Sequence, residues 1–276
     1  MKSFFRKLVV NARPIGQIIT LLFVGILPSL LDVTKGVVKQ PEITASQKLF
    51  DYIFYLVWTM GNEAIGVFLL IAALITIRKC NKGYIFNRGD LYKDYPYIWY
   101  WICAKILGYS ECNLVLVPIF MQFKLVIRDT FDKYHCGTFD KKDNDTISLN
   151  KSNMTKILDE VNLIIADTYP LSEKQIPKSK RKYPTILISR DNSVDHNRYY
   201  SPKLVQELVN EVRQLPANIK KVNVFATTNP QNTMNIINNA FKLGERGNLD
   251  EVIVFQQNKN GNPRRFKKKG KRVYRR

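Results

Sequence analysis

Two long apolar runs dominate the first third of the chain. No charged residue occurs from Pro14 to Leu31, and residues 52–77 are apolar apart from a short polar stretch near their centre. A helix rises about 1.5 Å per residue and a bilayer's hydrocarbon core is about 30 Å thick. Residues 15–31 are just long enough to cross it, and residues 52–77 are comfortably long enough. The pattern predicts a membrane α-helical hairpin within residues 1–78.

A cleavable signal peptide is the competing interpretation of the first run. Lys2, Arg6 and Lys7 form the basic segment that precedes the apolar core of such peptides. However, no small-x-small cleavage pattern ends the run, and a second apolar run follows closely. We therefore interpret both runs as membrane helices.

The flanking charges predict the orientation of the hairpin. Residues 1–14 carry four Lys or Arg and residues 78–94 carry five, whereas residues 32–51 carry three lysines balanced by three acids. Lys and Arg concentrate on the cytoplasmic side of membrane proteins. We therefore expect both termini in the cytoplasm and the hairpin in the inner (plasma) membrane.

Asn62 and Glu63 place polar groups in the middle of the second run. An ionised carboxylate at mid-bilayer costs about 3 kcal/mol or more, so it should face protein or a wet cavity. We expect these two residues to line a pore or to form a gating contact. The alternative is a protonated or hydrogen-bonded Glu63 that joins helices. Both interpretations imply a homo-oligomer surrounded by membrane lipids.

Residues 79–111 are the predicted juxtamembrane linker. The aromatic-rich stretch up to residue 107 is too short to span, so we expect an amphipathic segment at the inner interface with Trp99 and Trp101 at headgroup depth. The first core helix of the next domain is the alternative. Residues 113–127 indicate one or two strands interrupted at Pro118, and residues 137–153 indicate a solvated loop.

Residues 112–258 form the predicted cytoplasmic domain. Short apolar runs at residues 161–166, 184–189, 221–226 and 252–255 indicate strands, and helical patterns lie at residues 201–215 and 229–243. Ser201 and Pro202 suit a helix start, and Gly244 suits a helix end. Such alternation predicts an α/β, Rossmann-like domain with a mostly parallel sheet.

Ligands of parallel α/β sheets bind beyond the carboxyl ends of the strands. Polar residues follow three of the predicted strands, namely Asp167 and Thr168, then Arg190, Asp191 and Asn192, then Thr227, Thr228 and Asn229. Thr228 or Asn229 also caps the following helix, whose free N–H groups suit a phosphate. We expect a nucleotide or oligonucleotide site at Arg190, Asn192, Thr227, Thr228 and Asn229. The alternative is that these residues only form turns and caps.

The formal charge of +20 is extreme for 276 residues and predicts a negatively charged partner. Residues 259–276 form a predicted basic tail with ten Lys or Arg and no acid, and residues 178–182 form a second basic cluster. We expect Lys180, Arg181, Arg264 and Arg265 to contact the phosphates of the ligand. A solvated tail, or one that adheres to the anionic inner leaflet, is the alternative.

No pattern typical of catalysis or metal binding is present. The GxGxxG, Walker and nucleophile-elbow motifs are absent, the four cysteines are irregularly spaced, and only two histidines occur. We therefore expect no enzyme, no cofactor and no metal. A membrane-tethered enzyme that uses Asp167, Asp191 or Asp195 as acid–base groups is an alternative.

The pattern KVNVFATTNPQNTMNIINNAFKLGERGNLDEVIVFQQ resembles the closing half of the SAVED and CARF sensor domains of bacterial anti-phage systems. A strand ends in small polar residues and Pro230, a helix follows, and after Leu243 and Gly244 comes a strand with a hairpin. Such domains sense cyclic or linear oligonucleotides, and with two transmembrane helices they act as membrane-disrupting effectors. The chain is short for a two-lobed SAVED domain, which favours a ligand shared between subunits.

These features together predict an oligomeric membrane effector or ion channel of bacterial anti-phage defence, gated by an anionic nucleotide or oligonucleotide. The resemblance implies a homo-oligomer, as a tetramer or another symmetric ring, with a cyclic or linear oligonucleotide as ligand. It also implies a cognate nucleotidyltransferase as a partner. The alternative is a membrane-anchored scaffold that binds nucleic acid or a partner protein without forming a pore.

Overall fold

The computed structural model of the chain describes residues 11–37, 49–89, 91–155, 158–191, 198–242, 249–258, 260–261 and 263–276. The chain divides into two compact units, each of which has its own packing. The helical unit comprises Met1–Gly89 and Trp101–Ser110, and the sheet unit comprises Asp90–Tyr100 and Glu111–Arg276. Part of the predicted linker thus belongs to the helical unit, and the described part of the predicted basic tail belongs to the sheet unit.

Among the described residues, α2 (Ala12–Leu31) is the one helix that is long and apolar enough by itself to cross a membrane. After α3 (Val33–Val37), α4 (Leu49–Thr59) and α5 (Gly61–Asn81) pass the same test only as a pair, with a bend of 49° between them. The continuous span predicted over residues 52–77 is therefore corrected to a bent pair, and the helices alone do not confirm a hairpin of two full spans.

Two local features explain the bend between α4 and α5. The Thr59 hydroxyl donates a hydrogen bond of 2.7 Å to the Tyr55 carbonyl oxygen, which competes with the backbone bonds of the helix. Gly61 is the first residue of α5, and glycine weakens the continuity of a helix. A hydropathy average over the run does not record either effect, because the polar residues at the bend are flanked by long apolar stretches on both sides.

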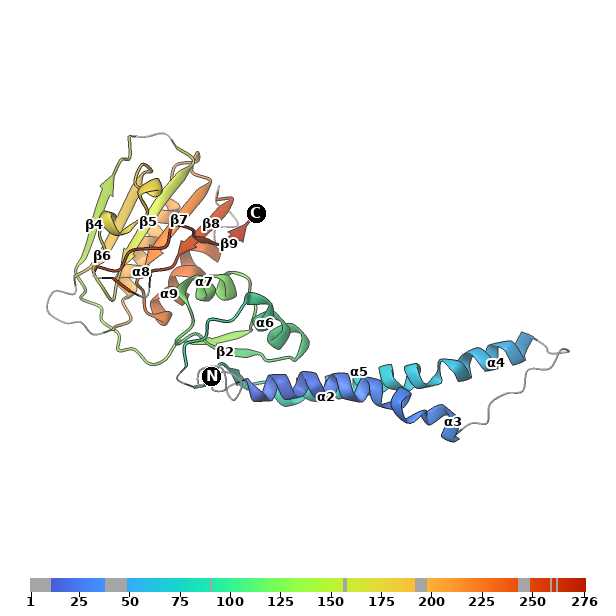
Figure 1. Cartoon of the computed structure of the whole chain (residues 1–276). Helices are drawn as coiled ribbons and strands as arrows, with labels where there is room; N and C mark the ends of the chain where they lie inside the picture. The colour runs from blue at the N-terminus through green and yellow to red at the C-terminus, as the bar shows by residue number, and fades with distance from the viewer. Residues whose placement is uncertain are drawn as a thin grey trace. The chain divides into compact units, whose positions relative to one another are not determined.

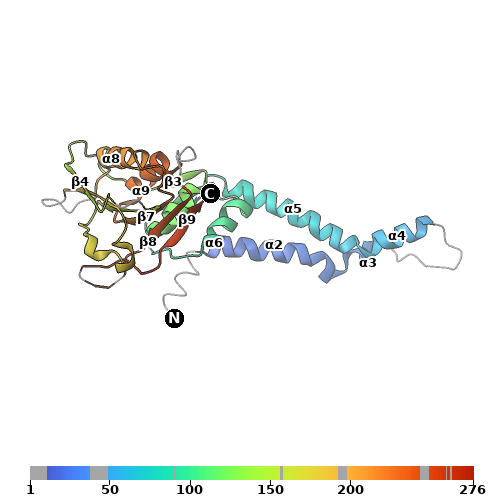
Figure 2. The same cartoon turned by 90° about the horizontal axis from the view of Figure 1, so that it is seen from above.

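Helices α2 and α5 lie side by side and run in opposite directions (Figures 1 and 2). At one end, the side-chain amides of Gln17 and Asn81 exchange two hydrogen bonds of 2.9 and 3.0 Å. At the other end, the Asn62 amide donates to Asp32 Oδ1 at 3.0 Å. Polar contacts therefore fix the register of the two helices at both ends.

The middle of the α2–α5 contact depends on glycine. A Cβ atom at Gly66 would lie 2.3 Å from the carbonyl oxygen of Gly25, so the two backbones touch there. Away from this contact, the two helices expose large apolar side chains: Ile19, Leu22, Phe23, Ile26, Leu30, Val67, Phe68, Ile71 and Ile75. An apolar surface of this kind is typical of a helix pair that faces lipid.

The segment that follows the helices is short and partly buried. The two-residue strand β1 (Ile85–Phe86) precedes α6 (Tyr97–Trp101), which continues as a π-helical turn, η1 (Ile102–Ile106). Tyr100, Cys103 and Leu107 are completely buried. This burial fits the core-helix interpretation of the segment, and the headgroup depth of Trp99 and Trp101 stays a prediction.

A six-stranded sheet forms the centre of the sheet unit, in the order β4-β6-β5-β7-β8-β9. Its strands are β4 (Ile147–Ser152), β5 (Glu160–Ala166), β6 (Thr185–Arg190), β7 (Lys221–Ala226), β8 (Glu251–Phe255) and β9 (Lys271–Arg275). The four inner strands pair in parallel, while β4 pairs antiparallel with β6 and β9 with β8. The sheet is therefore mixed, which corrects the prediction of a mostly parallel sheet.

Both antiparallel edge strands arise where the sequence predicted no strand. Strand β4 lies in the stretch predicted as a solvated loop, and its four central side chains are exposed, so it lacks an apolar signal. Strand β9 lies in the predicted basic tail and returns antiparallel to β8. Of its side chains only Val273 is buried. Edge strands with charged side chains are common, because charge discourages pairing with other chains.

Helices α7 (Ile119–Ile127), α8 (Pro202–Arg213) and α9 (Pro230–Ile236) cover one face of the sheet, and α9 contacts both α7 and α8 (Figure 1). Helix α9 continues as a π-helical turn, η4 (Ile237–Lys242). The predicted caps are confirmed, because the Ser201 side chain accepts from Leu204 N and the Asn229 side chain accepts from Asn232 N. The predicted helix end at Gly244 lies outside the described residues.

Helix α7 corrects the strands predicted over residues 113–127. Only the three-residue strand β2 (Glu111–Asn113) precedes it, and β2 pairs in parallel with β3 (Lys133–His135). Pro118 occupies the N-cap position of α7 rather than interrupting a strand, and Met121 and Leu125 point one turn apart into the core. A short apolar run does not distinguish a buried helix from a buried strand.

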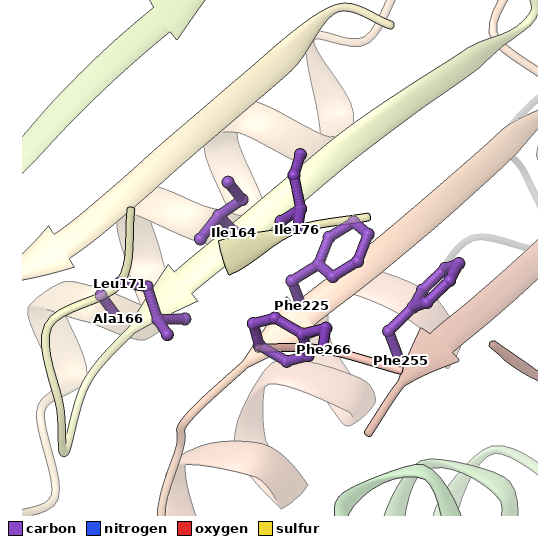
Figure 3. Close-up of a cluster of buried hydrophobic side chains, with 7 residues drawn as sticks. All are labelled: Ile164, Ala166, Leu171, Ile176, Phe225, Phe255 and Phe266. Carbon is purple, nitrogen blue, oxygen red and sulfur yellow. The ribbon is translucent and has the colours of Figure 1, made fainter. Parts of the chain in front are cut away.

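Irregular segments pack on the opposite face of the sheet, around a cluster of buried side chains (Figure 3). Strand residues Ile164, Phe225 and Phe255 meet Ile176, from the connection between β5 and β6, and Phe266, from the segment before β9. The Phe225 and Phe255 rings stack with centroids 4.5 Å apart. The β5–β6 connection also contains the short 3-10 turns η2 (Glu173–Gln175) and η3 (Lys178–Lys180). Phe266 thereby ties the basic C-terminal segment into the core.

We expect Gly66→Ala to destabilise the helical unit, because the new Cβ atom would overlap the Gly25 carbonyl oxygen. Overpacking of this kind costs roughly 1–3 kcal/mol. Gly16→Ala is the matched control, since no atom lies within 4 Å of a Cβ at that position. Thermal unfolding of both variants in detergent micelles measures the difference. Equal midpoints for the two variants would contradict the close contact.

Candidate functional site

A buried ion pair lies at the carboxyl ends of β5 and β6. Asp167 follows β5 and Arg190 is the last residue of β6, and both side chains are at most 1% exposed. Arg190 Nε donates to Asp167 Oδ1 at 2.9 Å, and Arg190 Nη1 lies 3.9 Å from Asp145 Oδ1. Two carboxylates therefore hold the guanidinium group inside the protein.

Asp167 also joins these strands to α9. Its Oδ2 atom accepts hydrogen bonds from the Asn229 backbone N–H at 3.2 Å, from the Asn229 side chain at 3.3 Å and from the Asn232 side chain at 2.8 Å. Both asparagine side chains also donate to the Tyr199 carbonyl oxygen. Burial raises the pKa of Asp167, and these donors together with the Arg190 charge oppose that rise.

The threonines at the end of β7 bond to neighbouring backbone and side chains. The Thr227 hydroxyl donates to the Tyr169 carbonyl oxygen at 3.0 Å, and the Thr168 hydroxyl donates to the Thr227 carbonyl oxygen. The Thr228 and Thr233 hydroxyls share a hydrogen bond of 2.6 Å. The fold thus brings Arg190, Thr227, Thr228 and Asn229 to one sheet edge, where they form a packed polar cluster. Their role in ligand binding stays a prediction, and Asn192, Asp195 and His196 lie outside the described residues.

Lys180 and Arg181 lie at the opposite end of the sheet. Lys180 Nζ donates to Glu160 Oε2 at 2.6 Å, and Lys221 Nζ donates to Glu160 Oε1 at 2.8 Å, beside the amino ends of β5 and β7. Burial acts to raise the pKa of Glu160, but its hydrogen bonds from Lys180, Lys221 and Asn223 outweigh this and hold the pKa at about 2. The fold therefore separates these cations from the cluster around Arg190.

A cavity of about 480 Å³ lies beside the edge strand β9. Its walls come from the segment that leads into α6, from α7, from the segments between β8 and β9, and from the start of β9. We name it the tyrosine–lysine cavity. Its lining residues, all from the sheet unit, are Tyr92, Asp94, Tyr95, Pro96, Tyr97, Phe120, Met121, Lys124, Gln256, Gln257, Lys267, Lys271 and Arg272.

Positive charge dominates the tyrosine–lysine cavity, because four Lys or Arg line it against the single carboxylate of Asp94. Lys124 Nζ lies 4.7 Å from the Tyr97 ring centre, and the Arg128 guanidinium carbon lies 5.2 Å from it. Burial lowers the pKa of Lys124, and the charges of Arg128 and Lys271 lower it further. A bound anion would offset this repulsion, so the cavity favours a negatively charged occupant.

The cavity also offers groups that recognise a nucleobase. Tyr92, Tyr95 and Phe120 supply aromatic faces, on which bases stack without regard to sequence. Gln256 supplies a side-chain amide, and its Oε1 atom is buried without a hydrogen-bond partner among the described residues. Buried acceptors of this kind are rare without a donor. Aromatic faces, lysines and an amide together suit a ligand that carries both bases and phosphates.

Sequence reasoning missed this cavity because its walls are distant in the chain. Three separate parts of the sequence supply its lining residues: the aromatic stretch that leads into α6, the apolar run that forms α7, and the basic C-terminal segment. The pairing of β9 with β8 carries Lys271 and Arg272 to the sheet edge. Residues 271–275 do not alternate between apolar and polar, and only Val273 among them is buried, so the sequence offered no strand signal that would have placed them there.

A second cavity, of about 420 Å³, contains one of the predicted cations. It is lined by Tyr169, Pro170, Gln175, Gln257, Gly261, Pro263 and Arg264. Gln257 lines both cavities, so they share a wall. Arg265 is exposed and lines neither cavity, and its carbonyl oxygen accepts from Asn258 N at 2.9 Å.

The predicted pore residues lie at the start of α5. The Asn62 side chain donates to Asp32 Oδ1 and accepts from Thr34 N at 2.9 Å. The Glu63 side chain is exposed and has no hydrogen-bond or ion-pair partner among the described residues. Glu63 is therefore level with the end of α2, near the bend between α4 and α5, and its predicted position in the membrane stays a prediction.

Three solved structures of a receptor from Acinetobacter baumannii are similar to this chain at 10% sequence identity. They are the Cap4 SAVED/CARF-domain containing receptor with the cyclic trinucleotide 3'3'3'-cAAA, with 2'3'3'-cAAA, and without a named ligand, with TM-scores of 0.45, 0.45 and 0.42. Each match covers 84% of this chain, which spans only 63%, 62% and 61% of the respective receptor chains. No curated protein sequence matches the chain.

The model of one protein family matches residues 1–274, which is nearly the whole chain. Its description combines two transmembrane segments with an effector role, and both were expected from the apolar runs and from the C-terminal pattern. The association with a membrane therefore rests on the family as well as on α2. The chain belongs to the family of SMODS- and Ubiquitin system-associated 2TM effector domains.

Proposed function

We propose that this anti-phage effector domain is a membrane channel gated by an anionic nucleotide or oligonucleotide that binds in the tyrosine–lysine cavity. The observation that carries the proposal is the composition of that cavity, with four cations, several aromatic rings and one carboxylate. Lysines and arginines bind phosphates, and aromatic rings stack on bases. A volume of about 480 Å³ lies within the usual range for small-ligand sites. The ligand is bound and not converted.

The position of the cavity supports coupling to the membrane. Residues 92–97 form one of its walls, and along the chain they follow α5 after only a short connection. A ligand that contacts these residues together with α7 and β9 would stabilise one arrangement of the segment that leads to the membrane helices. Gating requires such differential binding to two states.

The proposed channel is a symmetric assembly in the inner membrane, and its ligand comes from a partner enzyme. We place both termini in the cytoplasm and the hairpin in the inner membrane, following the flanking charges. A symmetric homo-oligomer would surround the pore, with Glu63 and Asn62 at its distal mouth. A cognate nucleotidyltransferase would supply the ligand. The solved receptors with cyclic trinucleotides make cyclic adenine oligonucleotides the first class to test.

We expect the double substitution Lys267→Glu and Lys271→Glu to weaken ligand binding about tenfold or more, because each charged hydrogen bond contributes about 1.5–3 kcal/mol. Fluorescence anisotropy with a panel of labelled cyclic and linear adenine oligonucleotides measures the change. The matched control is Lys268→Glu with Lys269→Glu, which changes the net charge equally. Both control lysines are exposed and lie outside the cavity lining. Equal weakening by the two double variants would indicate diffuse charge attraction and contradict the proposed site.

We expect Glu63→Gln to reduce the preference of the open channel for cations several-fold, because a ring of carboxylates at a pore mouth concentrates cations. Ion flux from liposomes that hold the purified chain, with ligand added, measures the preference. Thr76→Val is the control, since Thr76 is exposed on α5, far from Glu63, and its hydroxyl bonds only to its own helix. Absence of any ligand-dependent flux in the unsubstituted chain would favour the scaffold alternative.

A further inference from the structure

Positive charge collects at the end of the α2–α5 pair where α2 begins and α5 ends. The exposed cations of the helical unit at this end are Arg13, Arg78, Lys79, Lys82, Arg88 and Lys105. The acidic residues that the structure describes in this unit lie at or beyond its other end: Asp32, Asp51 and Glu63. Within the described part of the helical unit, these cations therefore have no neighbouring acidic residue.

Arg13 joins the start of α2 to the end of α5. Its Nη2 atom donates to the Cys80 carbonyl oxygen at 3.1 Å and to Asn81 Oδ1 at 3.2 Å. Its guanidinium carbon lies 3.8 Å from the centre of the Tyr84 ring. These contacts fix the orientation of the Arg13 side chain, while its Nε and Nη1 atoms have no hydrogen-bond acceptor among the described residues.

The same tyrosine ring carries a second arginine. The Arg88 guanidinium carbon lies 5.2 Å from the centre of the Tyr84 ring. The ring is itself anchored, because it packs edge-on against buried Tyr109 with centroids 5.9 Å apart. The Tyr109 hydroxyl in turn donates to Gln17 Oε1 at 3.2 Å. We name Arg13, Tyr84 and Arg88 the arginine–tyrosine site.

Two guanidinium groups on one ring repel each other. The negative face of an aromatic ring attracts a cation, but it offsets only part of the repulsion between two full charges. A phosphate group would offset the rest, because a guanidinium group presents paired N–H donors that match two phosphate oxygens. The arginine–tyrosine site therefore suits a single phosphate held by two arginines.

The position of the site indicates the source of that phosphate. Exposed apolar side chains of the helix pair come close to it along both helices. Ile75, 50% exposed, lies one turn before Arg78 on α5, and Ile19, 61% exposed, lies less than two turns after Arg13 on α2. The cations therefore begin where the apolar exterior ends, which is the level at which lipid phosphates lie when such helices cross a bilayer.

We propose that the arginine–tyrosine site binds the headgroup phosphate of an anionic phospholipid. Arg13 and Arg88 contact the phosphate, and Tyr84 holds the two guanidinium groups in place. The acyl chains of the lipid lie along the apolar exterior of α2 and α5. The inference rests on the membrane association of the family and does not depend on the tyrosine–lysine cavity or on gating.

Electron paramagnetic resonance of spin-labelled lipids tests this assignment without any nucleotide. The full chain is placed in phosphatidylcholine vesicles that contain a trace of spin-labelled phosphatidylglycerol or spin-labelled phosphatidylcholine. The fraction of motionally restricted label gives the preference of the chain for the anionic lipid. We expect Arg88→Gln to lower this preference at least about threefold, because a charged guanidinium–phosphate contact is lost. Lys82→Gln is the matched control, since Lys82 is exposed at the same end and the substitution removes the same charge.

Two substitutions of Tyr84 separate a built site from diffuse charge attraction. We expect Tyr84→Leu, which changes no charge, to lower the preference as Arg88→Gln does, and Tyr84→Phe, which keeps the ring, to leave it unchanged. Equal losses for Arg88→Gln and Lys82→Gln, an unchanged preference in Tyr84→Leu, or no preference in the unsubstituted chain would each overturn the inference. Displacement of the labelled phosphatidylglycerol by millimolar inorganic phosphate at constant ionic strength would assign the site to a soluble anion and would overturn it too.

Discussion

One buried carboxylate, Asp167, holds the carboxyl ends of the central strands together. It receives donors from Arg190 at the end of β6 and from Asn229 and Asn232 on α9, and the asparagines in turn hold the Tyr199 carbonyl oxygen. Removing one partner from such a buried pair costs about 3–5 kcal/mol. Because these side chains bond to one another, they form a packed polar cluster at the edge of the sheet where ligands of parallel sheets usually bind. The basic cavity lies instead at the β9 edge.

The inner strands and the caps could be predicted from the sequence because they obey local rules. Strands buried on both faces read as short apolar runs, and β5 and β7 were placed to within one residue. Strands β4 and β9 could not be predicted in this way, because one is polar and the other basic, and backbone pairing alone makes them strands. Helix α7 has an apolar run too short to distinguish from a strand.

The sequence predicted the kind of ligand that the candidate site would bind, but it did not predict where the site lies in the fold. The net charge of +20 indicated an anionic partner, and the basic C-terminal segment supplies Lys267, Lys271 and Arg272 to the cavity. Tyr92 and Lys124, which line the same cavity, precede these C-terminal residues by more than 140 positions in the chain. Only the folded structure therefore shows that these residues lie together. In the membrane part, the polar residues Asn62 and Glu63 were interpreted as the middle of a span. The structure places them at the start of α5. The Asn62 side chain bonds there to Asp32, the residue that follows α2.

In the proposed function, a nucleotide bound in the tyrosine–lysine cavity controls a symmetric membrane assembly. Native mass spectrometry of the chain, purified in detergent from bacterial cells, tests it most directly because it reports stoichiometry and bound nucleotide together. We expect a symmetric oligomer that carries a nucleotide or short oligonucleotide, and we expect the variant with Lys267→Glu and Lys271→Glu to lose that ligand. A bare monomer, or a nucleotide that remains bound to the variant, would contradict it.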